Sequence, residues 1–508
     1  MDWGELARTA FMTVYTFLLV VVSMYGFHRY LLVWLYYRHR KNAPKLTGRF
    51  EELPQVTVQL PMYNERLVAR RIIEKACQID YPKDKLQVQV LDDSTDDTCR
   101  IAQQAVQEAT AKGFDVEYIH RDDRKGYKAG ALAHGMKTAK GEFITIFDAD
   151  FVPDRDFLNR SIQYFTNPKV CVVQSRWAHL NRNDSLLTRT QAIFLDGHFA
   201  IEHVARNRSD RFMSFNGTAG TWRKTAIDDA GGWQHDTLTE DLDLSYRAQM
   251  RGWKFVFLPD LTAPAELPPE RNAFKAQQFR WTKGGAQTAL KLLPKVFLSK
   301  EPLKVKIEAF FHLTCFSMHI FMLMLVLLMF PAMYLRCIPL DDGTVVRRLF
   351  DVGVFALATL SAGVFYVASQ YELTGDWRTT LKYMPMMMAL GVGLCVSNTK
   401  AILEALFGKK SEFVRTPKYG DSKNLAAAAK ATAIPRKHKR NFLPYVEFLF
   451  GMYMTACAVR SLVDLQSALA TPFLVIFAFG FYYVSVMSFQ AQRAARASDR
   501  APKERVKA

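Results

Sequence analysis

The chain has 508 residues, 49% of them hydrophobic, and a formal net charge of +18. This length exceeds a typical single domain, so we expect two or more folded parts. The excess positive charge flanks apolar segments, as the positive-inside rule predicts, and no zinc-finger spacing supports nucleic-acid binding. The seven cysteines form no CxxC pair, which argues against a zinc site and a disulfide framework.

The first predicted element is a membrane span at residues 11–37. Its apolar run is longer than that of a signal peptide and lacks a small-residue cleavage site, so we expect it to be retained. Four basic residues follow it directly: Arg38, Arg40, Lys41 and Lys45. Residues 1–50 are therefore predicted to form an N-terminal transmembrane helix and a basic linker.

Residues 51–298 are predicted to form a cytoplasmic α/β domain. Short β-branched runs at 56–60, 86–90, 115–120 and 142–147 alternate with helical patterns, which indicates parallel βαβ units. Ligands bind such sheets beyond the carboxyl ends of the strands. Four carboxylates occupy those ends: Asp92, Asp93, Asp148 and Asp150. We therefore expect a ligand site at this edge of the sheet.

Asp148 and Asp150 form a DxD motif after one of these strands. Alternate residues of an extended segment project to the same side, so both carboxylates can face one ion. Mg²⁺ or Mn²⁺ takes one or two carboxylates and completes its shell with phosphate oxygens and water. The chain has neither a G-x-x-x-x-G-K-[ST] loop nor G-x-G-x-x-G, so an ATPase and a dinucleotide enzyme are disfavoured.

The stretch DTLTEDLDLSYRAQMRGW at residues 236–253 predicts a helix that ends near Gly252. Thr237 and Glu240 fit a capping box, and acidic groups at a helix start offset the positive end of its dipole. A carboxylate fixed at a helix start is also suited to act as a general base. The residues alone leave both interpretations of Asp241 open, whereas we assign structural roles to Asp236 and Asp243.

The pentapeptide Gln277-Gln278-Phe279-Arg280-Trp281 precedes the second apolar stretch of the chain. Arg280 offers a planar fork for phosphate oxygens. Trp281 suits either a platform for a sugar ring or an anchor at the membrane interface. The pentapeptide by itself does not decide between these interpretations.

Five further apolar stretches follow, at 309–335, 350–367, 383–403, 442–462 and 469–487. If all six stretches cross the membrane, the basic block 409–440 falls on the side opposite to the soluble domain, against the charge rule. We therefore expect 383–403, which contains Pro385 and Asn398, to re-enter or to lie in the interface. Five spans remain, the later ones within residues 299–490, with the N-terminus outside. The basic loop 404–440 and the basic tail 491–508 are then cytoplasmic.

The motifs PMYNE, LDDSTDDT, DADF, TED and QQFRW occur in this order, with apolar stretches on both sides. This set resembles the processive family 2 glycosyltransferases, the group of cellulose and hyaluronan synthases. The stretches VQVLDDSTDDT, RKGYKAGAL, FDADFVPDRDF, VQSRWAHLN, FNGTAGTWR and AGGW are similar to plant cellulose-synthase-like mannan and xyloglucan-backbone synthases. The resemblance covers about residues 53–290. It implies an α/β fold, with a nucleotide-sugar-binding (Rossmann-like) glycosyltransferase domain inserted between transmembrane helices.

The resemblance also implies a role for each matching residue. The donor nucleotide sugar would be held by Tyr63, Glu65, Asp92, Asp93, Lys128, Asp148, Gln277 and Arg280, and the divalent metal by Asp148 and Asp150. Asp241 would be the catalytic base that deprotonates the acceptor hydroxyl. The acceptor would be bound by Phe215, Asn216, Gly217, Thr218, Glu240 and Trp281. Residues 413–418 resemble the gating loop FxVTxK of cellulose synthases, from which they depart by Arg415 in place of its valine.

The activity implied is that of an inverting, processive hexosyltransferase of EC 2.4.1 type, which uses UDP-glucose or GDP-mannose with Mg²⁺ or Mn²⁺. Its product would be a β-linked polysaccharide, with a β-1,4 glucan, mannan or glucomannan favoured. The enzyme would be integral to the cell (inner or plasma) membrane or to an endomembrane, would have its catalytic domain in the cytoplasm, and would pass the growing chain between its spans. Export subunits are candidate partners.

Two alternatives accompany this interpretation. In the first, a single sugar is transferred to a lipid acceptor, but Arg280 and Trp281 favour polymerisation because similar pentapeptides mark the processive enzymes. The second is a transporter or scaffold with an inactive nucleotide-binding domain, whose spans would carry ionisable residues along a pathway. The predicted spans hold few charges, chiefly Arg29, Glu447 and Arg460, and every expected catalytic carboxylate is present.

Overall fold

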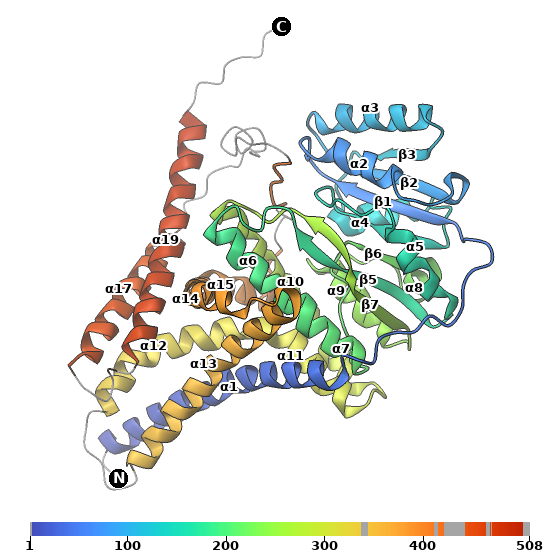
Figure 1. Ribbon diagram of the computed structural model, residues 1–508. Coiled ribbons are helices and arrows are strands. Elements are labelled where there is room, and N and C mark those ends of the chain that lie inside the picture. Colours follow the sequence, from blue (N-terminus) through green and yellow to red (C-terminus); the bar gives the residue numbers. More distant parts are fainter. Residues whose placement is uncertain are drawn as a thin grey trace.

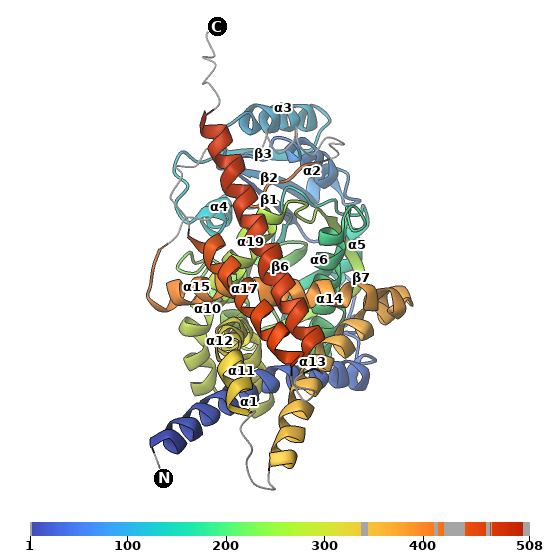
Figure 2. The same cartoon turned by 90° about the vertical axis from the view of Figure 1, so that its left-hand side faces the viewer.

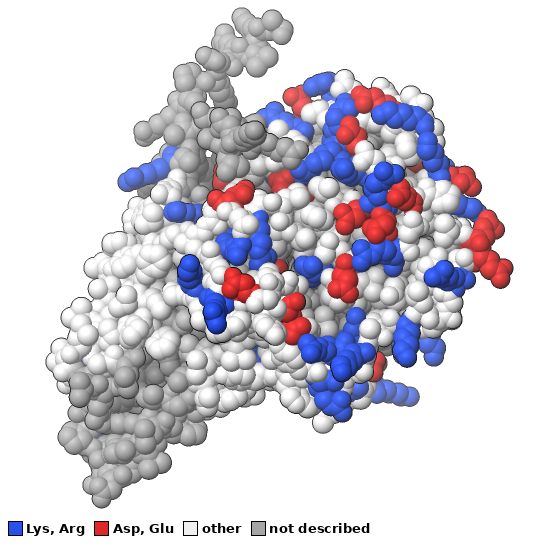
Figure 3. Space-filling model, viewed as in Figure 1, with Lys and Arg blue, Asp and Glu red and all other residues white. Residues whose placement is uncertain are grey.

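The computed structural model describes residues 3–336, 344–410, 415–420, 442–463, 468 and 470–500. It consists of an α/β domain built on one mixed sheet and a set of long helices beside it (Figure 1). The face shown in Figure 3 carries its charged side chains over the α/β domain, whereas the described surface of the helices is almost free of charge. The expected α/β domain flanked by long apolar helices is confirmed.

The sheet has seven strands in the order β3-β2-β1-β4-β6-β5-β7. Their bounds are β1 Val56–Met62, β2 Leu86–Asp92, β3 Asp115–His120, β4 Phe143–Ile146, β5 Val170–His179, β6 Gly220–Arg223 and β7 Lys254–Ala265. The four predicted strands coincide with β1 to β4, which pair in parallel as expected. Strand β6 runs antiparallel to both β4 and β5, so the sheet is mixed rather than purely parallel.

The central strands alternate apolar and polar side chains although every residue of β1 and β2 is buried. Val56, Val58 and Leu60 face the main apolar core. The polar residues between them point to the other face, where the side chain of Thr57 donates to Gln87 and that of Gln59 donates to Gln89. Buried polar groups are tolerated when they are hydrogen-bonded, so this alternation stabilises the register of the sheet.

Short helices cover both faces of the sheet and extend to its carboxyl edge, where a ligand site is expected. Their bounds are α2 Ala69–Cys77, η1 Lys83–Lys85, α3 Thr98–Ala111, α4 Tyr127–Gly135, α5 Phe157–Ser161, η2 Ile162–Thr166, α6 Leu186–Asp196, η3 Gly197–His203, α7 Val204–Arg208, α8 Lys224–Asp229 and α9 Glu240–Gln249. Helix η3 is a π-helical turn between α6 and α7. Such turns are rare and occur often at functional sites.

The remaining helices, most of them long, lie beside the α/β domain (Figure 1) and in front of it when the molecule is viewed from their side (Figure 2). They are α1 Trp3–His39, α10 Arg271–Leu298, α11 Leu303–Thr314, η4 Cys315–Ser317, α12 Met318–Arg336, α13 Thr344–Thr374, α14 Trp377–Gly393, α15 Cys395–Leu406, α17 Leu443–Ser461 and α19 Thr471–Arg500. Helix α1 packs against α12 and α13, and α17 packs against α19. Helix α10 packs against α15 and thereby joins the two parts of the molecule.

Within the described residues, three helical segments are long and apolar enough to cross a membrane: Trp3–His39, Leu303–Leu335 and Thr471–Gln490. They include the predicted stretches 11–37 and 309–335 and nearly all of 469–487. The stretch 383–403, which we expected not to cross simply, spans α14 and α15 and is bent by 40° between them, a geometry shared by broken spans and re-entrant segments. Stretches 350–367 and 442–462 lie in α13 and α17. The number and direction of the crossings stay predictions.

Parts of the predicted basic segments lie outside the described residues. These are 411–414 and 421–440 in the loop 404–440 and 501–508 in the tail. Of the gating-like segment 413–418, Arg415 onward is described.

Candidate active site

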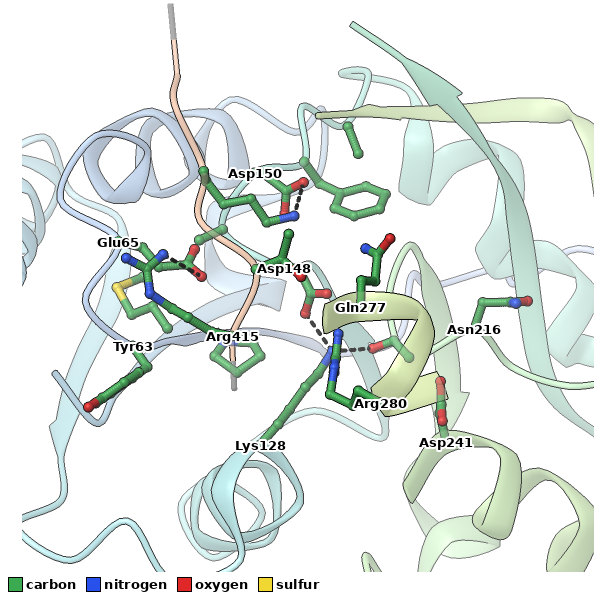
Figure 4. Close-up of a pocket in the computed structure, with 18 of the residues that line it drawn as sticks. Tyr63, Glu65, Lys128, Asp148, Asp150, Asn216, Asp241, Gln277, Arg280 and Arg415 are labelled. Atoms are coloured by element: carbon green, nitrogen blue, oxygen red, sulfur yellow. Dashed lines mark hydrogen bonds and ion pairs between the residues drawn. The ribbon is translucent and has the colours of Figure 1, made fainter. Parts of the chain in front are cut away.

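A cavity opens at the carboxyl edge of the sheet, where the topology was expected to place a ligand (Figure 4). Its wall combines the ends of β1, β4 and β7, the starts of α4 and α9, one face of α10 and part of the segment 415–420. Thirteen of the sixteen predicted site residues line it: Tyr63, Glu65, Asp93, Lys128, Asp148, Asp150, Asn216, Gly217, Glu240, Asp241, Gln277, Arg280 and Trp281. The structure thus brings together residues from across the whole domain.

Asp148 and Asp150 follow β4 and carry the carboxylates expected to hold a metal. Lys128 donates from Nζ to Asp148 Oδ1 at 2.5 Å and to the carbonyl oxygen of Gly217 at 2.8 Å. Asp150 is 1% exposed, and among the described residues its Oδ1 has no hydrogen-bond partner. Burial raises the pKa of Asp150. A buried carboxylate oxygen without a partner suits a divalent cation, so these two residues fit the expected metal.

The segment 415–420 passes along the cavity beside Glu65 and Asp150 (Figure 4). Lys418 Nζ lies 2.6 Å from Asp150 Oδ2, and Arg415 Nη1 lies 3.8 Å from Glu65 Oε1. Burial raises the pKa of Glu65 to about 7. The carboxylate of Glu266, just after β7, accepts the backbone N–H groups of Tyr419 at 2.8 Å and Gly420 at 3.1 Å. The described part of the gating-like segment is therefore held in the cavity by side chains of the catalytic domain.

Asp93, another lining residue, is paired with a cationic side chain, and a second arginine stacks on Tyr63 nearby in the lining. Arg121 donates to both carboxylate oxygens of Asp93, at 2.7 and 2.5 Å. The guanidinium carbon of Arg124 lies 3.4 Å from the ring centre of Tyr63, a cation–π contact. The charge of Asp93 is thus matched by that of Arg121. Arg121 and Arg124 were not among the predicted site residues. Arg124 is the first residue of the stretch RKGYKAGAL, and Arg121 lies just before that stretch.

Asp241 lies in the first turn of α9, with its carboxylate directed toward Gly217. Its Oδ1 accepts the backbone N–H of Leu242 at 2.8 Å. A Cβ atom at Gly217 would come within 2.9 Å of Asp241 Oδ2, and Gly217 has φ +81°. Only glycine adopts this conformation readily, so Gly217 leaves the space in front of the carboxylate open. Burial, and secondly the charge of Glu240, raise the pKa of Asp241 to about 7.

The predicted capping box of Thr237 and Glu240 is wrong. Helix α9 begins at Glu240, so its N-cap is Thr239, and no side chain caps it. The hydroxyl of Thr239 pairs instead with that of Thr288 on α10, at 3.0 Å. Tertiary contact with α10 therefore replaces the local cap, and Glu240 turns into the cavity, where burial raises its pKa.

Asp236 and Asp243 have the structural contacts expected of them. Lys291 Nζ lies 2.8 Å from a carboxylate oxygen of Asp236 and 2.9 Å from Asp243 Oδ1. Asp243 also pairs with Arg247, one helical turn later, at 2.7 Å.

Helix α10 presents Gln277, Arg280 and Trp281 to the cavity. The acidic groups that act on the Arg280 guanidinium are Glu240, Asp148 and Asp241, while burial lowers its pKa. Arg280 thus lies between the DxD motif and the start of α9, where it can meet a charged leaving group.

Three predicted site residues do not line the cavity. Asp92 is fully buried at the end of β2, where its carboxylate accepts from Ser94 N at 2.9 Å and from the Tyr118 hydroxyl at 2.8 Å. Phe215 packs edge-on against Trp222 in the core. The Thr218 hydroxyl accepts the backbone N–H of Asp148 at 2.8 Å. All three are buried behind the cavity wall, and Thr218 there holds the backbone of Asp148, which does line the cavity.

The surroundings of Asn216 were not predicted. Its side-chain amide lies 2.9 Å from His198 Nε2, and its side-chain oxygen 2.5 Å from His203 Nε2. Both histidines belong to the π-helical turn η3, and His198 pairs further with Glu202 at 2.9 Å. The sequence LDGHFAIEHVAR carries no local signal for this network, because a π-turn is not visible in residue periodicity.

The mixed sheet, with paired carboxylates at its carboxyl edge and cationic groups facing them, defines a GT-A type nucleotide-sugar transferase. Comparisons with known proteins identify the family. A family described as glycosyltransferase like family 2 matches residues 54–284. A probable glucomannan 4-beta-mannosyltransferase 7 of Oryza sativa subsp. japonica is 36% identical over 422 residues, which cover 81% of this chain and 69% of that protein.

The glucomannan 4-beta-mannosyltransferase 7 of Arabidopsis thaliana is 32% identical over 490 residues, 91% of this chain and 85% of its own. A solved structure, a mannosyltransferase from Pyrobaculum calidifontis in complex with GDP-Man and Mn²⁺, aligns with a TM-score of 0.48 at 20% identity. That alignment covers 77% of this chain and 100% of the other. The chain belongs to the family 2 glycosyltransferases, among relatives of the cellulose-synthase-like group.

Proposed function

We propose that this protein is an inverting, processive membrane glycosyltransferase that polymerises hexoses from a nucleotide sugar into a β-linked polysaccharide. One observation carries the proposal. The carboxylate of Asp241 faces the open space at Gly217, and the same cavity holds Lys128, Arg280 and the DxD carboxylates. A base for the acceptor and a cationic site for the leaving diphosphate thus share one cavity, as direct displacement requires.

In the proposed reaction, the terminal hydroxyl of the glycan attacks the anomeric carbon of the donor sugar. Asp241 takes the hydroxyl proton as the new glycosidic bond forms. The bond between the anomeric carbon and the nucleoside diphosphate breaks in the same step, so the configuration inverts. Lys128 and Arg280 stabilise the diphosphate as its negative charge develops.

Asp148 and Asp150 are the residues that would hold the divalent metal. When bound, Mg²⁺ or Mn²⁺ neutralises charge on the leaving diphosphate. Tyr63, Glu65 and Asp93 would hold the nucleoside. Asn216, Gly217, Glu240 and Trp281 would form the acceptor side.

Polymerisation, rather than a single transfer, is supported by the relatives and by the architecture. The relatives are named as glucomannan 4-beta-mannosyltransferases, one of them as a probable one. A mannan or glucomannan is therefore the product we favour, and GDP-mannose and UDP-glucose are the donors to compare. Helix α10 links the cavity to the apolar helices, which would let the glycan leave across a membrane. We place the catalytic domain in the cytoplasm, and export subunits are candidate partners.

The function can be tested with inside-out membrane vesicles from cells that express the protein. Labelled GDP-mannose and UDP-glucose are supplied separately with Mg²⁺ or Mn²⁺, and vesicles with Asp241→Asn serve as the control. We expect polymer from one donor, absent from the control and degraded by a β-1,4-specific hydrolase. Label recovered only in lipid extracts would identify a lipid acceptor and overturn the proposed polymerisation.

A further inference from the structure

Helix α10 carries side chains of two kinds: some line the cavity, and others pair with neighbouring helices. Gln277, Arg280 and Trp281 line the cavity. At 3.6 residues per turn, Lys275 lies roughly opposite these residues. Lys283 comes about two turns after Lys275 and three residues after Arg280, so it projects beside Arg280 rather than opposite to it. Figures 1 and 2 show α10 and α15 side by side, and α10 also contacts α19. Both lysines contact neighbouring helices and not the cavity, Lys275 through Glu447 and Lys283 through Glu404.

Lys275 joins α10 to two of those helices at once. Its ammonium group pairs with Glu447 on α17 and lies 2.7 Å from the hydroxyl of Ser488 on α19. The Ser488 hydroxyl donates in turn to the other oxygen of Glu447, at 3.0 Å. Glu447 is fully buried, and the lysine side chain is 13% exposed. Three helices thus meet at one closed polar cluster.

Lys283 makes the second connection, to α15. Its side chain has no exposed surface, and its Nζ lies 3.0 Å from Glu404 Oε2. Glu404 also pairs with Lys409, at 3.2 Å. Helix α15 leads along the chain to the segment 415–420, whose Lys418 lies on Asp150. Lys283 therefore ties the helix that carries Arg280 to the helix from which the cavity-covering segment departs.

Buried ion pairs are directional, because an ammonium group must meet a carboxylate at one place and leaves an uncompensated charge anywhere else. Apolar contacts would hold α10 against its neighbours but would tolerate sliding and rotation more readily. Two such pairs, separated by two turns, define both the rotation of α10 and its position along its axis.

We infer that Lys275 and Lys283 are positioning residues for glycosyl transfer, which set Arg280 and Trp281 against the donor and the acceptor through the Glu447 and Glu404 pairs. This inference rests on the proposed function. When a pair is lost, α10 shifts, Trp281 no longer holds the acceptor against the donor, and water competes for the sugar. Displacements of about 1 Å in an active site can cost roughly a hundredfold in rate.

The test measures two products in vesicles or purified enzyme: sugar incorporated into polymer, and nucleoside diphosphate released. For Lys283→Met we expect kcat for incorporation to fall about tenfold or more while the donor KM stays within about twofold. Released nucleotide per incorporated sugar rises several-fold. Lys283→Arg restores most of the wild-type ratio. Lys295→Met, at an exposed position on the same helix, is the matched control and keeps that ratio.

Lys275→Glu is expected to raise the ratio of released nucleotide to incorporated sugar. Combining it with Glu447→Lys should bring this ratio back toward that of the wild type. A purely structural role lowers incorporation and nucleotide release together, in proportion to the folded protein measured by thermal unfolding. That result, or an unchanged ratio in Lys283→Met, overturns the inference. A wild-type enzyme that incorporates no sugar overturns the proposed function instead, so the two failures are distinguishable.

Discussion

Asp241 and Glu240 are adjacent in the chain and both face the cavity, yet they are not equivalent. Asp241 points to the space at Gly217, whereas Glu240 lies among Lys128 and Arg280. Two neighbouring buried carboxylates raise each other's pKa, which keeps a base near neutrality poised to accept a proton. From this arrangement we draw two predictions about single residues.

Asp241→Asn removes the base and keeps the shape of the side chain. We expect kcat for transfer to fall roughly a thousandfold, within the range typical of general-base catalysis. Binding of the nucleotide, measured by calorimetry, stays near the wild-type value because Asp241 is placed on the acceptor side. Asp236→Asn, a change on the exposed side of the same stretch, serves as the control. Transfer within tenfold of the wild type in Asp241→Asn would remove this residue from the base role.

The pH dependence follows from the pKa of Asp241, which is raised to about 7. The carboxyl group accepts a proton only when deprotonated, so kcat/KM rises with pH up to about 7 and then levels off. Glu240→Gln removes the charge that helps raise the pKa of Asp241, so the rising limb moves to lower pH. A pH profile of kcat/KM for both proteins checks this. A limb that stays in place, or moves to higher pH, contradicts the assignment of Asp241 as the titrating base.

At the scale of a single element, the segment 415–420 lines the cavity and contacts its carboxylates. Its Lys418 ammonium group pairs with the Asp150 carboxylate, and the Glu266 carboxylate accepts the backbone N–H groups of the two residues that follow. If Asp150 holds a metal as proposed, the Lys418 ammonium group competes with the cation for its carboxylate. Charge-assisted hydrogen bonds contribute about 1.5–3 kcal/mol, so this contact weakens metal binding in the absence of nucleotide.

For Lys418→Ala we therefore expect Mn²⁺ to bind the nucleotide-free enzyme about tenfold more tightly, which corresponds to about 1.4 kcal/mol. Electron paramagnetic resonance of free Mn²⁺, titrated with purified protein, measures this directly. Lys418→Arg keeps the charge and should keep the affinity of the wild type. Equal Mn²⁺ affinity in the alanine variant and the wild type would show that Lys418 does not compete for the site.

At the scale of the whole molecule, buried polar contacts join the catalytic domain to α11, and α11 in turn to α1. Arg206 on α7 lies 2.9 Å from Glu308 on α11, and Glu308 lies 3.0 Å from His28 on α1. Arg206 and Glu308 are 3% and 1% exposed. The α/β domain is thus held to the long helices by charged groups that water does not reach.

Glu308→Ala should destabilise the protein, but by less than the about 3–5 kcal/mol of a fully lost buried pair, because Glu202 still pairs with Arg206 at 3.3 Å. Thermal unfolding in detergent provides the measurement. Glu108→Ala breaks the exposed pair with Arg70 and should leave the unfolding temperature almost unchanged. Equal shifts for the two variants would mean that the buried pair contributes no more than the exposed one.

The predicted topology places the N-terminus opposite to the catalytic domain and the C-terminus on the same side as that domain. Single cysteines introduced near residue 5, at the exposed Lys112 and near residue 500, in a background without exposed cysteines, can be tested with an impermeant thiol reagent. In sealed inside-out vesicles we expect the second and third sites to react and the first to be protected. Reaction at all three sites would rule out an odd number of spans.

Several features of the fold could be predicted because their causes are local. Alternation along β1 and β2 and the turn residues after them define strands and their ends, and the parallel order then gathers the strand-end aspartates at one edge. The apolar stretches near the two chain ends likewise depend only on composition. Which of Asp92 and Asp93 lines the cavity was not predictable. Neighbouring residues of a strand point to opposite sides, and only the packing of the sheet decides which side faces the cavity.

What the sequence by itself determined is the α/β domain between apolar helices, the DxD motif at a strand end and an acidic helix start. These follow from periodicity and spacing within a few residues. The tertiary structure alone decided which groups meet: Lys418 with Asp150, which are 268 positions apart, Lys283 with Glu404, and Thr239 with Thr288 in place of a local cap. The physical reason is that an ion pair or hydrogen bond between distant residues forms only after the sheet and the long helices have packed, and no local pattern records where they come together.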